Sequence, residues 1–428
     1  MKISKFIIDI MAVLKPFLTK IIPLSFLHRC KQRYMNWNTS KLKDEKIMKF
    51  EPNRYKDGIN LIGAIQGQYG LGQSCRLVAK ELAASDVDFC AVEHHVSNQM
   101  NLGDHSCDEF LVDEPIYNIN LFHINAHEFT ISYQQLGKHI WDYRYTIAFW
   151  LWELEEFPDE WVGCIDILDE IWTPSEFVSN AIRKKTNKPV ITIPYHVEAP
   201  IDEKLDRNYF GLPNGKFLYL MMYDSNSMME RKNPVGALKA FKKAFDRDNE
   251  DVGLVIKLNG NNQEDIDYIK NFLDGYNNIY FMTERLSKIE VNSLIADVDV
   301  FVSMHRAEGF GLVMAEAMLN GTPCIATNWS ANTEFMNDDV ACMLDYKLIP
   351  LEKDIGPFKK GNMWADPDID QAAEYMRKLY YDKEYYDRKK DNAKKYLDYW
   401  LGKNHIKEII QQRVGEILNN NSFQERRY

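Results

Sequence analysis

One stretch of the chain limits its possible folds more than any other feature: residues 298–326 read VDVFVSMHRAEGFGLVMAEAMLNGTPCIA. An apolar run at Val300–Met304 indicates a buried strand, and a polar turn follows it and ends in Gly309-Phe310-Gly311. A helix is expected from about Leu312, and a second apolar run at Pro323–Ala326 indicates the next strand. Alternating strands and helices are typical of a parallel sheet that is covered by helices on both faces.

The same alternation fills most of the chain. A predicted strand at Gly58–Ala64 runs into three glycines within residues 67–72 and then into a helical pattern at 73–82, which is how a Rossmann-like unit begins. Further strands are expected at Phe89–Val92, Asn118–Ile124, Thr146–Trp150, Glu170–Trp172, Val190–Pro194, Phe217–Tyr223, Gly253–Leu258 and Ile279–Met282. We therefore predict an α/β protein with two Rossmann-like, doubly wound domains that face each other across a cleft. Open sheets of this kind bind ligands at the carboxyl ends of their strands, so the cleft is expected to hold the site.

The length of 428 residues suits two or three domains. The turn-rich segment 198–215 is the best linker candidate, and residues 368–420 are expected to be helical. The predicted boundaries are a basic N-terminal segment at 1–50, a first Rossmann-like domain at 51–205, a second at 206–400 and a C-terminal helix at 401–428.

Charge is distributed unevenly along the chain. The net charge of −11 disfavours a nucleic-acid partner, yet residues 1–50 sum to +8 while the remainder sums to −19. Apolar residues within 3–21 follow helical spacing, and charged residues interrupt them too often for a membrane span or a signal peptide. Residues 1–28 are expected either to bind an anionic membrane surface or to pack as a helix on protein. The seven cysteines form no C-x-x-C pair, which favours a reducing cytosol.

Two carboxylates mark the candidate site. Glu308 and Glu316 lie about 12 Å apart along a helix, a separation that suits the two ends of one extended ligand. The glycines at 309 and 311 let the backbone approach that ligand, and the start of the helix attracts a diphosphate. A second interpretation is that Glu308 only caps the helix and Glu316 is solvated.

The segment EGFGLVMAEAMLNGTPCIAT resembles the donor-site signature of retaining glycosyltransferases of family 4, which have the GT-B fold. The resemblance implies that residues 206–400 bind a nucleotide sugar and that residues 51–205 form the acceptor side. DSNSMMERKNP at 224–234 resembles the family's phosphate-gripping turn, in which Arg231 and Lys232 would hold the diphosphate. Lys257 could also reach the phosphates, and which of these cations acts is left open.

The first domain resembles the same family more loosely. GQYGLGQSCR at 67–76 resembles the glycine loop that borders the donor, and Glu153 stands where many relatives place a histidine that faces the transferred sugar. WLWEL at 150–154 and DEIWTPSEFVSNAI at 169–182 resemble enzymes of bacterial surface-polysaccharide synthesis, including mannosyl- and rhamnosyl-type transferases. The catalytic residues implied are Glu308, Lys232, Arg231 and Glu153. The donor-binding residues implied are Gly70, Gly72, Lys257, Gly309, Phe310, Gly311, Leu312 and Glu316.

The resemblance implies a retaining, metal-independent glycosyltransferase that uses a nucleotide-diphosphate sugar as substrate and needs no cofactor. The acceptor would be a glycan or a lipid-linked oligosaccharide, and the protein would be cytoplasmic and peripheral on the inner face of the membrane. Asp297-Val298-Asp299 is a D-x-D, but its place at the start of an apolar strand disfavours metal binding, and the spacing of His123 and His127 does not match a zinc motif. A nucleotide-sugar isomerase and a non-catalytic scaffold subunit remain as alternatives.

Overall fold

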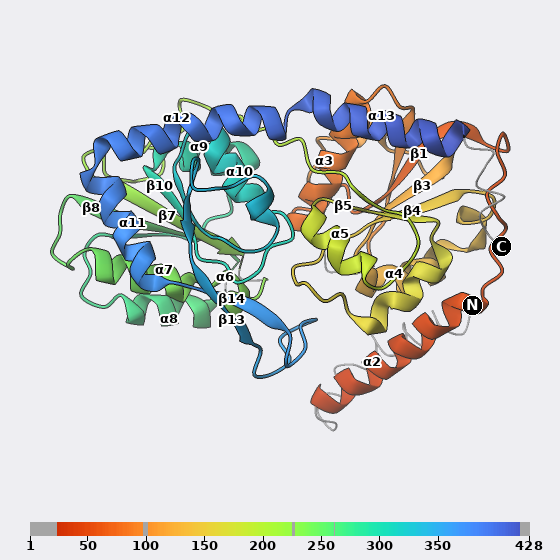
Figure 1. The fold of residues 1–428 in the computed structure, drawn as a ribbon, viewed down its shortest axis with the longest axis horizontal. Helices are drawn as coiled ribbons and strands as arrows, with labels where there is room; N and C mark the ends of the chain where they lie inside the picture. The colour runs from red at the N-terminus through yellow and green to blue at the C-terminus, as the bar shows by residue number, and fades with distance from the viewer. Residues whose placement is uncertain (1–23, 97–101, 225–226, 261, 420–428) are drawn as a thin grey trace.

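The computed structural model describes residues 24–96, 102–224, 227–260 and 262–419. Two six-stranded sheets dominate it, each in a domain of its own, and helices cover both (Figure 1). The paired strands of both sheets are parallel. The predicted fold class is therefore confirmed. The helix expected within residues 3–21 lies outside the described residues.

The first domain holds the sheet β2-β1-β3-β4-β5-β6. Its strands are β1 Lys56–Gly63, β2 Phe89–Glu93, β3 Tyr117–His123, β4 Tyr145–Phe149, β5 Glu170–Thr173 and β6 Val190–Thr192. Its helices are α2 Leu24–Lys41, α3 Gly70–Ala84, α4 Ala126–Leu136 and α5 Glu176–Arg183, with 3-10 turns η1 Leu42–Asp44, η2 Asp108–Phe110, η3 Lys138–Ile140 and η4 Asp159–Ile167.

The second domain holds the sheet β12-β11-β10-β7-β8-β9. Its strands are β7 Phe217–Asp224, β8 Val252–Asn259, β9 Ile279–Met282, β10 Val300–Ser303, β11 Cys324–Thr327 and β12 Cys342–Leu344. Its helices are α6 Met229–Lys232, α7 Pro234–Ala244, α8 Gln263–Phe272, α9 Lys288–Asp297, α10 Leu312–Leu319, α11 Ile369–Tyr381 and α12 Lys383–Trp400, with the 3-10 turn η5 Ala331–Glu334. A separate antiparallel pair, β13 Tyr346–Pro350 and β14 Met363–Pro367, lies between β12 and α11.

The strand order of the second sheet reverses between β7 and β10, which are neighbours although two strands, β8 and β9, lie between them in the chain. The loops that leave the carboxyl ends of these two strands diverge to opposite faces of the sheet. Such a topological switch point is where open α/β sheets bind their ligands. The loop after β7 carries Arg231 and Lys232, and the loop after β10 carries Glu308, so topology alone brings these side chains to one edge.

The last helix, α13 Lys403–Asn419, returns to the first domain, where it packs on α3 (Figure 1). Glu170 of β5 is completely buried and its carboxylate is bonded by the guanidinium of Arg413. The same carboxylate accepts hydrogen bonds from the Tyr145 hydroxyl at 2.9 Å and the Trp172 indole at 2.6 Å. The helical tail expected at 368–420 is thus three helices, and the third is held by a buried ion pair with the other domain.

Other differences from the sequence-based expectation are local. The strand predicted at Val300–Met304 ends one residue earlier, as β10 Val300–Ser303. Asp299, directly before it, accepts from the Leu218 amide at 2.7 Å and pairs with Arg207 at 2.9 Å. The antiparallel pair β13–β14 and strand β12 have no counterpart in the prediction. Among the described residues, no helix is both long enough and apolar enough to cross a membrane.

Candidate functional site

The four predicted catalytic side chains meet where the domains face each other. The Lys232 ammonium contacts Glu308 Oε1, and the Arg231 guanidinium lies 3.5 Å from Glu308 Oε2. The same guanidinium lies 3.9 Å from Glu153 Oε1, which belongs to the first domain. Two cations and two carboxylates therefore form one cluster, and we refer to these four residues as the charge cluster.

Local backbone geometry fixes the cations of the charge cluster. Helix α6 ends at Asn233, which adopts a left-handed conformation with φ 51° and ψ 50°. Its side chain caps α7 by accepting from the Gly236 amide at 3.2 Å, and it donates to the Met304 carbonyl at 2.9 Å. Asparagine is among the few residues that adopt this conformation readily, and it is a favoured N-cap. One residue thus ends α6, begins α7 and ties both to the loop that carries Glu308.

Glu308 is held as a carboxylate. Burial raises its pKa, but the charges of Lys232 and Arg231 outweigh this effect and bring the pKa from 4.5 down to about 2. Arg231 is itself buried and donates to the Ala307 carbonyl at 2.9 Å, and its pKa is raised because Glu308 and Glu153 outweigh its desolvation. The interpretation in which Glu308 only caps a helix is therefore wrong.

The glycine turn after Glu308 lies against the first domain. A Cβ on Gly309 would meet the Trp152 carbonyl oxygen at 2.9 Å, and the Gly309 carbonyl accepts from the Ser175 hydroxyl at 3.0 Å. The Phe310 ring packs edge-on against Tyr195 at 4.9 Å. Gly311 has φ 101° and caps α10, so the predicted helix start at Leu312 is confirmed.

Glu316 lies on α10 and is buried, with 1% of its surface exposed. Its Oε1 contacts the Lys288 ammonium, while its Oε2 has no hydrogen-bond partner among the described residues. Burial raises its pKa, and the charge of Lys288 opposes this shift. The interpretation of Glu316 as a solvated residue is wrong, and the unpartnered buried oxygen is a position at which a ligand hydroxyl could donate.

Lys257 is not part of the charge cluster. It is buried in β8, where its ammonium donates to Asn259 Oδ1 at 2.6 Å and to the Leu258 carbonyl at 3.1 Å, and burial lowers its pKa. Because β8 is the neighbour of β7, Lys257 sits one strand away from the loop that carries Arg231.

Two of the predicted donor-binding glycines, Gly70 and Gly72 in the first turn of α3, differ in their surroundings. A Cβ on Gly72 would lie 2.1 Å from the Gly67 carbonyl oxygen, whereas a Cβ on Gly70 would meet nothing within 4 Å. Packing therefore requires glycine at position 72 but not at position 70.

Gly72→Ala is expected to lower the free energy of unfolding by about 1–3 kcal/mol, the usual cost of overpacking, because the backbone of Gly67 must move. Gly70→Ala is the matched control in the same helical turn and is expected to leave stability unchanged in the ligand-free protein. Thermal unfolding of both variants measures the difference. Equal melting temperatures for the two would contradict the close approach of Gly72 to Gly67.

Sequence reasoning missed two residues that organise the site. Arg306 donates its amide to the Arg231 carbonyl at 2.7 Å and its guanidinium to the Glu230 carbonyl at 2.9 Å, so it ties α6 to the loop of Glu308. Glu334 accepts hydrogen bonds from the amides of Glu176 at 3.0 Å and Phe177 at 2.8 Å across the domain boundary. Neither has a local sequence signal, because both act on partners far away in the chain.

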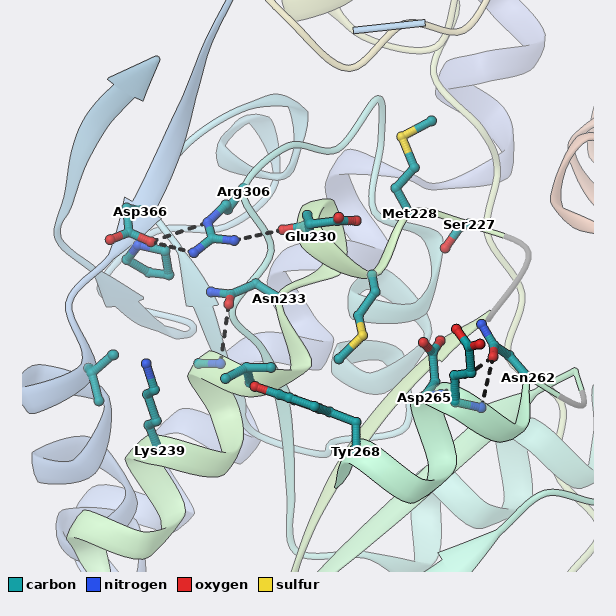
Figure 2. Close-up of a pocket in the computed structure, with 16 residues that line it drawn as sticks. Ser227, Met228, Glu230, Asn233, Lys239, Asn262, Asp265, Tyr268, Arg306 and Asp366 are labelled. Carbon is teal, nitrogen blue, oxygen red and sulfur yellow. Dashed lines mark hydrogen bonds and ion pairs between the residues drawn. The ribbon is translucent and has the colours of Figure 1, made fainter. Parts of the chain in front are cut away.

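A cavity of about 700 Å³ lies beside α6 (Figure 2). Met229 and Glu230 line it, whereas Arg231 and Lys232 of the same short helix take part in the charge cluster. Arg306 spans its upper wall and pairs with Asp366 at 2.8 Å. None of the residues predicted for the site lines this cavity, so it is distinct from the charge cluster.

Among the described residues, no group of three or more His, Cys, Asp and Glu side chains could hold a metal ion. His123 Nε2 hydrogen-bonds the Ser74 hydroxyl at 2.7 Å, and the His127 ring lies 5.6 Å from Trp161. His123 and His127 therefore contact different residues.

Comparison with known proteins bears on the second domain and on the fold. Residues 203–396 match the family model described as glycosyl transferases group 1. HepE of Anabaena in complex with UDP and glucose superposes with a TM-score of 0.60 at 12% identity, covering 84% of this chain and 100% of its own. A glycosyltransferase of Rickettsia africae gives 0.61 at 14% identity and covers 85% and 99%, and the sucrose-phosphate synthase of Thermosynechococcus elongatus gives 0.60 at 12% and covers 84% and 99%. No curated protein sequence matches the chain.

The two sheets, their strand orders and these neighbours show that the protein has the GT-B fold. The residues that match the group 1 glycosyltransferase model, 203–396, cover most of the second domain.

Proposed function

We propose that the protein is a retaining glycosyltransferase that moves a sugar from a nucleotide-diphosphate donor to a glycan acceptor in bacterial polysaccharide or glycoconjugate synthesis. The observation that supports this most is the charge cluster, which sits at the switch point of a domain that matches group 1 glycosyltransferases. Ligands of open α/β sheets bind at such points.

The chemistry follows from where charge develops. As the bond between the sugar and the diphosphate breaks, negative charge grows on the leaving diphosphate and positive charge grows on the sugar. Arg231 and Lys232 would stabilise the diphosphate, and the start of α10 after Gly311 adds backbone dipoles of the same sense. These side chains supply the positive charge that the leaving group needs, which is the basis for proposing a metal-independent reaction.

Glu308 would hold the donor sugar. In the ligand-free protein it neutralises Lys232 and Arg231, so an incoming diphosphate would take over these cations and free the carboxylate for the hydroxyls of the sugar. The resemblance to retaining glycosyltransferases implies that retention would proceed without a covalent enzyme intermediate, by attack from the face of the leaving group.

Two other predicted residues would also contact the donor. Glu316 Oε2 would accept from ribose hydroxyls, and Glu153 would approach the transferred sugar from the first domain. The mannosyl- or rhamnosyl-type specificity suggested by the resemblance remains part of the proposal. HepE was solved with UDP and glucose, which makes UDP and its sugars the first donors to test.

A thermal-shift screen with UDP, GDP, dTDP and ADP tests the proposal. A nucleotide at 100 times its Kd stabilises the folded protein by about 2.7 kcal/mol, which identifies the base. The matching nucleotide sugar should then be consumed, and its anomeric configuration should be kept in the product. If none of the four nucleotides stabilises the protein, the proposal fails.

We also propose that residues 1–28 attach the protein to an anionic membrane at the inner face of the cell membrane, where a lipid-linked acceptor would be found. The charge of +8 over residues 1–50 supports this, and within those residues Trp37 of α2 is 58% exposed. The full chain is expected to float with vesicles that contain anionic lipid, whereas a chain without residues 1–50 is not. Equal flotation of the two would contradict the membrane assignment.

A further inference from the structure

The antiparallel pair β13–β14 belongs to neither of the large sheets and contacts both domains. We call residues 346–367 the bridging hairpin. Figure 1 shows it as a separate ribbon that leaves the second domain beside α6 and extends toward the first domain. Its register pairs Tyr346 with Pro367 and Pro350 with Met363, so the segment between Pro350 and Met363 forms its tip.

The base of the bridging hairpin is fixed to the loop that carries Glu308. The Ala365 amide donates to the Arg306 carbonyl at 3.0 Å, and Asp366 pairs with the Arg306 guanidinium at 2.8 Å. Arg306 lies two residues before Glu308 and also bonds the carbonyls of Glu230 and Arg231. The base is therefore connected to the half of the charge cluster that comes from the second domain.

The tip of the bridging hairpin is ordered by its own hydrogen bonds. Leu351 and Asn362 are joined at 2.8 Å, and Ile355 and Phe358 exchange two backbone hydrogen bonds at 2.9 and 3.0 Å. These bonds turn the Phe358 ring into the first domain, where it is 1% exposed and lies 5.3 Å from the Trp152 ring. The neighbouring Lys359 pairs with Glu160 of η4 at 3.4 Å.

Trp152 directly precedes Glu153, the only member of the charge cluster that comes from the first domain. Trp152 is buried, its indole donates to the Glu156 carbonyl at 3.0 Å, and its carbonyl faces Gly309. The position of Trp152 therefore determines where the Glu153 carboxylate lies relative to the Arg231 guanidinium. The bridging hairpin therefore contacts both domains beside the charge cluster. Its base contacts Arg306 of the second domain, and its tip contacts Trp152 of the first.

We propose that the bridging hairpin positions Glu153 against Arg231 and the donor sugar, and that Phe358 is the positioning residue through which it acts. Phe358 does not touch the charge cluster; it acts through Trp152. This inference rests on the proposed glycosyltransferase function. It matters for rate because a displacement of about 1 Å in a reacting group can cost on the order of 100-fold.

The test is a double-mutant cycle that measures donor turnover, read as the release of nucleoside diphosphate from a panel of UDP-, GDP-, dTDP- and ADP-sugars. Phe358→Ala is expected to lower the turnover number about tenfold and to leave the Kd of the nucleotide within about twofold of the wild type. In the Glu153→Gln background, Phe358→Ala should lower turnover little further, because the carboxylate that Phe358 is proposed to position is already gone. Phe358→Leu, which keeps an apolar side chain in the pocket, is expected to restore most of the turnover.

Two further variants separate positioning from folding. Leu348→Ala, on the exposed side of the same hairpin, is the matched control and should leave turnover unchanged. If Phe358→Ala does not fold, the ion pair between Lys359 and Glu160 provides a second test. Lys359→Glu and Glu160→Lys should each lower turnover, and the double variant, in which the charges are exchanged, should restore it.

The outcomes distinguish this inference from the function on which it rests. A wild-type protein that turns over none of the nucleotide sugars overturns both. A wild-type protein that is active, with Phe358→Ala within twofold of it, overturns the inference alone. Effects of Phe358→Ala and Glu153→Gln that multiply in the double variant also overturn it, because they would show that the two residues act independently.

Discussion

Donor turnover is expected to fall at least about 100-fold in Glu308→Gln and in Lys232→Ala, the scale for removing one strong transition-state contact. Glu308→Gln leaves Lys232 and Arg231 without their closest counter-charge and removes the acceptor proposed for the sugar hydroxyls. Lys232→Ala removes one of the two charges proposed for the leaving diphosphate. Because such contacts strengthen as charge develops, the loss should appear in the turnover number more than in the affinity for the donor.

Glu230→Gln is the matched control for this pair. Glu230 lies on the same four-residue helix but lines the neighbouring cavity rather than the charge cluster. Its turnover should stay within about twofold of the wild type. Near-normal turnover in both Glu308→Gln and Lys232→Ala would reject the assignment of the site.

Arg413→Ala is expected to destabilise the first domain by about 3 kcal/mol, at the lower end of the range for breaking a buried ion pair. Glu170 is completely buried, and without Arg413 it would keep only the neutral donors Tyr145 and Trp172. A buried carboxylate without a counter-charge is costly because it has lost its hydration. Urea unfolding followed by tryptophan fluorescence measures the change.

Lys407→Ala on the same helix provides the comparison. Its partner Asp86 is exposed, so this pair is screened by solvent and its loss should affect stability far less. If the two variants unfold at the same urea concentration, burial of the Arg413 pair does not hold α13 in place.

Apart from β12, the strands of the two sheets could be predicted from the sequence to within about two residues, and the reason is physical. Both faces of a parallel sheet are buried, so a central strand is a short apolar run bounded by turn residues, as at Val252–Asn259. The bridging hairpin carries no such signal. Strand β13 has no buried residue, and the partners of Phe358 lie in the other domain. Local patterns contain no information about such distant contacts.

The residues of the candidate site also divide into those that have a local sequence signal and those that do not. Glu308 could be selected because a strand, a glycine turn and a helix surround it, and Arg231 and Lys232 because their segment resembles the phosphate-gripping turn of a known family. The strand order then brings the three together. Arg306 and Lys288 could not be selected, because an arginine or lysine near a helix start usually faces solvent. Their importance appears only when the Glu230 carbonyl and the buried Glu316 carboxylate are placed beside them.

The return of α13 to the first domain has a consequence for biosynthesis. Domains generally fold as units while the chain emerges from the ribosome, beginning at the N-terminus. Here the partner of Glu170 is made more than two hundred residues later, so this carboxylate must wait for Arg413 until the second domain has been translated. The nascent first domain therefore lacks the counter-charge of one buried carboxylate for as long as the second domain is still being made.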